Sequence, residues 1–277
     1  MYVVVNNPTA EAIPALSEVG SYALWDKLNE WFGGRLPKTN AEKTNAELKE
    51  LAKETGTPIM FNNHSRGSLT DKVSTAYLQN VKGITGIPIE QTKYLGPAAN
   101  IVGEFDMLNK NGYVDENGIN STLFLGNNNT DFVGRLVGLN PVTAGNCTGN
   151  PLGSCYSHSS YNGAYYVEQF LLDKNGKKYL DKKTGKPIEN PEFRKINNTV
   201  AKLEQDETGD YVNVTVPQAV VIGNDGNINL VDQRGKMTTY DKRTLKPIKT
   251  TQIPIHEING KRYFNYGGKK YHAVPPM

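Results

Sequence analysis

Strand-like and helix-like segments alternate along the first 165 residues of the chain. Short apolar runs predict buried strands, and apolar residues at three- or four-residue spacing predict helices. The predicted strands are Tyr2–Val5, Pro58–Phe61, Gln91–Leu95 and Ser121–Leu125. The predicted helices cover residues 15–32, 40–54 and 69–80. This order is typical of an α/β fold with a mostly parallel sheet flanked by helices.

Turn-forming residues follow the predicted strands. Asn6–Thr9 comes after the first strand, and glycine-led loops begin at Gly96 and Gly126 after two later ones. The carboxyl ends of parallel strands line the ligand crevice of open α/β sheets. We therefore expect these loops to converge on one edge, where polar side chains are candidates for function.

The pattern changes near residue 171 to lysine-rich, turn-rich sequence. The segment 172–188 recurs as 231–248, with Asp-Lys-Lys-Thr-Gly-Lys-Pro-Ile in the first copy and Asp-Lys-Arg-Thr-Leu-Lys-Pro-Ile in the second. Repeated turn residues between segments that alternate apolar and polar positions predict two β-hairpin units. We expect a long strand over 211–221 and a short helix over 192–203. The predicted domains are thus 1–171, hydrolase-like, and 172–277, a separable β-rich appendage.

Composition fits a globular protein, with 37% hydrophobic residues in 277. No apolar stretch approaches the roughly 20 residues of a membrane-spanning helix, and we see no signal peptide in this chain. The net charge of +3 is unevenly distributed: residues 1–165 carry 12 basic and 15 acidic side chains, and residues 166–277 carry 19 and 13. The basic half is the candidate for contact with an anionic surface.

Two cysteines, Cys147 and Cys155, lie eight positions apart in a stretch rich in glycine, asparagine and proline. This spacing suits a disulfide that closes a small loop, and an isolated pair lacks the further ligands of a zinc site. A disulfide would indicate an oxidising compartment, whereas two free thiols are the alternative.

The strongest candidate for chemistry is Ser65, in the segment Asn63-His64-Ser65-Arg66-Gly67 between a predicted strand and a predicted helix. A nucleophile elbow has this order, because a sharp turn lifts the serine Oγ into the crevice and points the helix N-terminus at the forming oxyanion. Small residues near the serine let helix and strand pack closely. Gly67 occupies the second glycine position of that motif, and Asn63 replaces the first.

Simpler roles exist for both polar residues of the turn. A serine before a helix is often only an N-cap, so Ser65 could have that role. His64, next to the proposed nucleophile, is expected to pack rather than react.

The base and the orienting acid should follow the nucleophile in the order Ser, Asp, His. Asp131 comes shortly after the strand 121–125, and His158 comes after a further loop. Asp106 and Glu104 are alternatives for the acid but lie one strand too early. Of the other histidines, His64 adjoins the nucleophile and His256 and His272 fall in the appendage, so elimination favours His158.

The set Asn-His-Ser65-Arg-Gly, Tyr94-Leu-Gly-Pro-Ala, Asp131-Phe-Val-Gly and His158-Ser-Ser-Tyr resembles lipases of the α/β-hydrolase fold. The resemblance covers about residues 1–172. It implies a serine hydrolase that acts on a carboxylic ester, such as a lipid ester, with no metal or organic cofactor. The oxyanion would be held by the backbone N–H of Arg66 and one from Asn7 or Thr9. The strands that usually precede that second loop are missing, so the sheet is minimal or the chain is a fragment.

A second resemblance rests on Asn-Asn-Pro-Thr (6–9) together with His-Ser-Arg-Gly (64–67). It is to hydrolase-like segments near the C-terminus of bacterial two-partner-secreted, filamentous-haemagglutinin-like exoproteins and contact-dependent toxins. It implies a secreted or cell-surface protein and a place within a larger exoprotein. Two alternative functions follow, an inactive hydrolase-like module for adhesion or delivery, or a toxin whose activity lies in residues 172–277.

Overall fold

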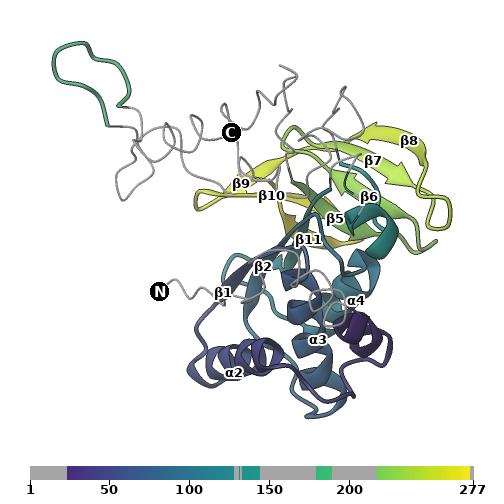
Figure 1. Cartoon of the computed structure of the whole chain (residues 1–277). Helices are drawn as coiled ribbons and strands as arrows, with labels where there is room; N and C mark the ends of the chain where they lie inside the picture. The colour runs from purple at the N-terminus through teal and green to yellow at the C-terminus, as the bar shows by residue number, and fades with distance from the viewer. Residues whose placement is uncertain (1–23, 128–130, 132, 144–178, 189–216, 275–277) are drawn as a thin grey trace, which may run out of the picture.

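The computed structural model of the chain describes residues 24–127, 131, 133–143, 179–188 and 217–274 (Figure 1). Its helices are α2 (Asn40–Thr55), α3 (Gly67–Asn80) and α4 (Ile101–Asn111), with a short π-helix, η1 (Val133–Val137), and helical residues at 24–31. No helix among these residues has both the length and the apolar character needed to cross a membrane.

Two sheets contain the strands. The first has seven strands in the order β1 (Ile59–His64), β2 (Ile89–Leu95), β4 (Thr122–Gly126), β5 (Gln218–Ile222), β6 (Ile228–Val231), β7 (Lys236–Tyr240) and β8 (Pro247–Gln252). The second has the order β3 (Ile119–Asn120), β11 (Lys269–His272), β10 (Lys261–Tyr266) and β9 (His256–Ile258).

The N-terminal half of the seven-stranded sheet is parallel. β1 pairs with β2 and β2 with β4, and the crossovers between them contain α3 and α4. α2, α3 and α4 lie together in Figure 1, beside β1 and β2. Buried residues of α3 and α4, such as Leu69 and Ile101, belong to the same core as Leu123 of β4. The predicted strands 58–61, 91–95 and 121–125 and the predicted helices 40–54 and 69–80 are therefore confirmed, whereas α4 was not predicted.

α2 shows how closely local sequence specifies its ends. Thr39 and Glu42 form a reciprocal capping box at the N-terminus, and Gly56 ends the helix with a φ of 66°. Both devices satisfy backbone groups that have no partner within the helix. The predicted bounds 40–54 agree with this element to within one residue.

The prediction of a mostly parallel sheet needs correction. From β4 onward every pairing in the seven-stranded sheet is antiparallel: β4–β5, β5–β6, β6–β7 and β7–β8. The architecture is mixed, with helices and a strand-rich C-terminal region. Hairpin connections of a few residues join β5 to β8, and such short connections permit only antiparallel neighbours.

The strand-rich C-terminal region is continuous with the N-terminal half. β5 hydrogen-bonds to β4, and β11 pairs with β3. Val220 and Leu230 belong to the same core cluster as Leu69 and Leu123, and the ring of Tyr271 lies 6.1 Å from that of Phe105 on α4. The predicted limit at 171/172 lies outside the described residues, but the strands on either side of it share one sheet and one core.

The predicted internal repeat forms two hairpin turns with the same hydrogen bonds. Asp181 and Asp241 each accept from the backbone N–H and the hydroxyl of the threonine three positions later, at 2.7 and 2.9 Å in both copies. The residue after that threonine has a positive φ, 65° at Gly185 and 55° at Leu245. Leu245 keeps this unfavourable conformation because its side chain packs against the core.

Truncation of the chain after residue 172 tests whether the C-terminal region is separable. The deletion removes β5, the hydrogen-bonding partner of β4, and exposes core residues such as Leu123 and Leu125. We expect the truncated chain to lose cooperative unfolding and to aggregate, because bare apolar edges associate. Circular dichroism melts and size-exclusion chromatography measure this. A monodisperse truncated chain with a cooperative transition would instead support a separable appendage.

Candidate active site

Three parallel strands end in one row. His64 of β1 is in register with Leu95 of β2, which is in register with Gly126 of β4. The next residues continue the row, because the N–H of Ser65 donates to Leu95 O and that of Gly96 to Gly126 O, at 3.0 and 2.8 Å. The loops after β1, β2 and β4 therefore meet at the carboxyl edge, as predicted.

Ser65 has an unusual backbone conformation. Its φ is 55°, in the left-handed region that a residue with a Cβ adopts at a cost of roughly 1–2 kcal/mol. It lies between β1 and α3, so the chain reverses within two residues. A strained serine at a strand–helix junction is the geometry of a nucleophile elbow.

Hydrogen bonds fix the turn in this conformation. The carbonyl oxygen of Ser65 accepts from the Ser68 N–H at 3.1 Å, the Ser68 hydroxyl at 2.6 Å and the Ala98 N–H at 3.3 Å. The Ser68 hydroxyl also accepts from the Ala99 N–H at 3.0 Å. The loop after β2 and the first turn of α3 thus hold the Ser65 backbone from two sides.

Ser65 is not the N-cap of α3. The N-cap of α3 is Arg66, in right-handed helical conformation, and no side chain caps the helix. The side chain of Ser65 is therefore not used to start the helix.

The close-packing argument for Gly67 is wrong. A Cβ at Gly67 would contact only Asn63, at 3.9 Å, which is an ordinary van der Waals distance. Alanine would fit here, so packing alone does not require a glycine at the second position of the motif.

Asn63, which replaces the first glycine of the motif, is buried and has its own partner. Its Nδ2 donates to Oδ2 of Asp71 at 2.8 Å. Lys49 of α2 in turn donates to the other carboxylate oxygen of Asp71 at 2.5 Å. Lys49 also donates to the hydroxyls of Ser74 and Thr75, at 2.8 and 2.7 Å. A buried, hydrogen-bonded ion pair between α2 and α3 therefore supports the strand residue two positions before Ser65.

A second acid lies close to this ion pair. Glu104 of α4 is fully buried, as is Tyr94 of β2. Burial, with the Asp71 carboxylate nearby, raises the pKa of Glu104 to about 8. The side chain is therefore protonated at neutral pH, which lets the core tolerate it.

Asp131 lies at the carboxyl edge after β4 and is buried. One of its carboxylate oxygens accepts from the N–H groups of Val133 and Gly134, at 2.8 and 3.0 Å, so it starts the π-helix η1. The segment is closed where the Thr143 N–H donates to Asn127 O at 2.9 Å. Asp131 thus follows β4, which ends at the same edge as β1, and its carboxylate is held by the start of η1.

The alternative acids occupy other places. Glu104 and Asp106 are both on α4, the first in the core and the second exposed to solvent. Neither follows the carboxyl end of a strand directly, so position favours Asp131.

Arg66 forms an ion pair with Asp26, which is fully buried in the helical segment 24–31. This pair ties the elbow to the first described helix. The oxyanion role of the Arg66 backbone N–H stays a prediction. His158, Asn7, Thr9, Cys147 and Cys155 lie outside the described residues.

The other rival bases lie elsewhere. His272 is at the amino end of the parallel strands, where its backbone N–H donates to Thr122 Oγ1 at 2.9 Å. His256 is exposed on β9 and stacks on Tyr263. Neither is at the edge that contains Ser65.

Sequence analysis did not single out Lys49 and Asp71, although they support the elbow. The sequence signal was that α3 is rich in polar residues. In the structure ten of its fourteen residues are buried, and most of these are polar. A polar helix with such burial requires internal partners, yet the sequence does not say which ones.

Comparison of the chain with protein families, with curated proteins and with solved structures found no significant match.

Replacing Ser65 with glycine should stabilise the fold relative to replacing it with alanine, by about 1 kcal/mol. Glycine adopts a positive φ without the Cβ clash, whereas alanine keeps it. Urea unfolding of Ser65→Gly and Ser65→Ala measures the difference. Equal stabilities would show that Ser65 is not held in the left-handed conformation.

The raised pKa of Glu104 predicts a pH dependence of stability. Between its ordinary value of 4.5 and about 8, the folded protein holds a proton that the unfolded chain has lost, so stability falls as the pH rises through this window. Glu104→Gln should flatten the fall, measured by urea unfolding at about pH 5, 6.5 and 8. Asp106→Asn, on the exposed face of the same helix, is the control. Equal slopes in wild type and Glu104→Gln would contradict the assignment.

Proposed function

We propose that the chain is a serine hydrolase that acts on carboxylic esters, with Ser65 as nucleophile. The observation that carries the proposal is the positive φ of Ser65 at the end of a parallel strand, directly before a helix. Proteins keep a strained residue where its surroundings overdetermine it, and such residues cluster at active sites. Ser65 lies at the edge where three parallel strands end, which supports its role as nucleophile.

The order of the strands supports Asp131 as the acid. From the nucleophile strand the sheet continues to β2 and then β4, and Asp131 follows β4. This is the chain order of nucleophile before acid that the hydrolase resemblance implies. His158 comes later in the chain and is the proposed base.

The proposed reaction uses these three residues in two steps. His158 removes the proton of Ser65 Oγ as Oγ attacks the acyl carbonyl, and then gives that proton to the departing alcohol. Water, deprotonated by His158, then hydrolyses the acyl-enzyme and restores Ser65. Asp131 orients the imidazole, and the Arg66 N–H, with one from Asn7 or Thr9, holds the oxyanion.

Exposed leucines near the proposed acid support an apolar acyl group. Leu136 and Leu139 are 62% and 56% exposed, in the loop that begins at Asp131. The side chain of Asn100, which caps α4 after the β2 loop, donates to Leu139 O and so brings the two loops together. Apolar side chains near the proposed acid favour a lipid-like substrate over a charged one.

The repeat turns of the C-terminal region are basic. Lysines on the two repeat turns are exposed, among them Lys182, Lys183, Lys242 and Lys246. We propose that they contact an anionic surface. A place in a larger, secreted or cell-surface exoprotein is likewise a proposal.

Labelling with a fluorophosphonate probe tests the enzyme directly. Wild type should be modified at Ser65, and Ser65→Ala should not be modified at all, because the probe reacts with an activated serine. Ser121→Ala, a buried serine at the other end of the sheet, should label as wild type does. The modified peptide is identified by mass spectrometry.

The partners of Ser65 are tested by the same labelling. His158→Ala and Asp131→Asn should slow modification by about 10³-fold or more, since each removes part of one catalytic unit. A folded wild type with no modified serine would instead support the inactive module. Normal labelling of His158→Ala would mean that another group is the base.

A further inference from the structure

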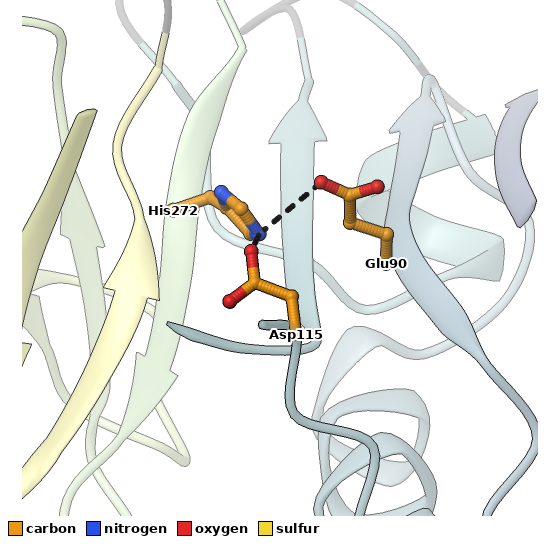
Figure 2. A group of neighbouring side chains, drawn as sticks. All are labelled: Glu90, Asp115 and His272. Atoms are coloured by element: carbon orange, nitrogen blue, oxygen red, sulfur yellow. Dashed lines mark ion pairs between the residues drawn. The ribbon is translucent and has the colours of Figure 1, made fainter. Parts of the chain in front are cut away.

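A second cluster of charged residues lies at the amino end of the parallel strands. Glu90 is in the first part of β2, Asp115 is in the turn before β3, and His272 ends β11. Figure 2 shows the imidazole of His272 and the two carboxylates pointing toward one another. One ligand atom from each lies within 4.8 Å of the other two. The three residues come from segments that are far apart in the chain.

The His272 ring nitrogen has an unmet hydrogen-bonding capacity. Its side chain is 4% exposed, and Nε2 is buried without a hydrogen-bond partner. Nε2 lies 3.7 Å from Glu90 Oε1 and 3.7 Å from Asp115 Oδ2, too far for hydrogen bonds. A buried nitrogen left in this way costs free energy unless another group binds it.

The carboxylate of Asp115 is oriented for a ligand. Its Oδ1 accepts from the N–H groups of Asn117 and Ile119, both at 2.9 Å. Oδ2 is thereby directed toward His272 and Glu90. Such outer hydrogen bonds are typical of oriented metal-ligating carboxylates.

A cation already occupies part of the cluster. Lys261 Nζ lies 3.0 Å from Glu90 Oε1, 3.0 Å from Asp115 Oδ2 and 3.1 Å from Glu116 Oε1. The Lys261 ammonium forms no hydrogen bond with His272 Nε2. The Lys261 side chain is 31% exposed and that of Glu116 is 70% exposed, so Lys261 has a route to solvent.

We propose that Glu90, Asp115 and His272 form a zinc site, in which the metal displaces the ammonium of Lys261. Two carboxylates and a neutral imidazole match the charge of a divalent ion, and water would complete four-coordination. Bonds of about 2.0 Å to tetrahedral zinc place ligand atoms roughly 3.3 Å apart. His272 Nε2 lies 3.7 Å from each carboxylate oxygen, and the three ligand atoms lie within 4.8 Å of one another, so zinc would draw the ligands together.

The donor set distinguishes zinc from the common hard cations. Calcium and magnesium prefer oxygen ligands alone, and a buried imidazole nitrogen suits zinc and its neighbours in the first transition row. Lys261, which cannot share the site with a dication, therefore acts as a competitor for it.

The cluster is separate from the proposed active site. Glu90 lies five residues before Leu95 along β2, roughly 16 Å at the rise of a strand, and Ser65 follows the register of Leu95. A metal there joins the seven-stranded sheet to β11 of the second sheet. The site would thus tie the last strand to the parallel half.

Zinc binding to the metal-stripped full chain, measured by competition with a chromophoric chelator, tests this site. Wild type should bind one zinc at the cluster, and His272→Gln should weaken that binding by about 100-fold. Lys261→Met should bind about tenfold more tightly than wild type, because no ammonium has to leave its carboxylates. If Lys261 did not compete with zinc for the carboxylates, Lys261→Met would not bind zinc more tightly than wild type.

The control is His256→Gln, which removes an exposed histidine from β9 and should bind zinc as wild type does. Binding by the two cysteines is recognised with cobalt, because thiolate ligands give intense charge-transfer absorption and nitrogen and oxygen ligands do not. If Lys261→Met folds only with zinc, the site is supported. Two outcomes would overturn the proposal. In one, wild type and His272→Gln bind zinc equally; in the other, neither wild type nor a folded Lys261→Met binds zinc. A preference for calcium or magnesium over zinc would also overturn it.

Discussion

The hydrogen bonding of β4 on both of its edges is the constraint on which the rest of the structure depends. On one side β4 is parallel to β2, and on the other it is antiparallel to β5. All five of its residues are buried, because neighbouring strands and helices cover them. The parallel half and the hairpin half therefore share a core, and neither has a complete set of strand partners alone. The segment that contains Asp131 also depends on this arrangement, since the Tyr240 hydroxyl of β7 donates to Val142 O at 3.0 Å.

Beneath the elbow, the protein uses a buried ion pair where an apolar core would be simpler. Lys49 and Asp71 are both buried, and the pair is linked to Asn63, two residues before Ser65. Replacing one member of a buried pair leaves the other charge without a partner, which costs about 3–5 kcal/mol. Such a network specifies one arrangement of β1, α2 and α3. A serine held at positive φ needs surroundings of this kind, because relaxation of the turn would release the strain.

The two ends of the parallel strands have different chemistry. At the carboxyl ends, Ser65 lies just before the N-terminus of α3, whose partial positive charge favours nearby negative charge. At the amino ends, Glu90, Asp115 and Glu116 make an acidic group that Lys261 partly neutralises. The proposed ester hydrolysis and the proposed zinc site thus each use the charge preference of their own end. A single sheet separates them by the length of a strand.

Much of the parallel half could be predicted from the sequence, because its signals are local. Apolar periodicity gave β1, β2, β4, α2 and α3 but not α4, and the repeat around Asp181 and Asp241 gave two matching turns. The strand–turn–helix order around Ser65 also predicted a sharp turn there, where Ser65 has a positive φ. Local sequence could not give the antiparallel pairing of β5 with β4, since the partners are nearly 100 positions apart and many strands are equally apolar. Nor could it bring Glu90, Asp115 and His272 together, or match Lys49 with Asp71.

Sequence determined which segments become strands, helices and turns, because those choices depend on neighbouring residues. Only the tertiary structure decided which side chains meet, because burial and charge pairing depend on the whole chain.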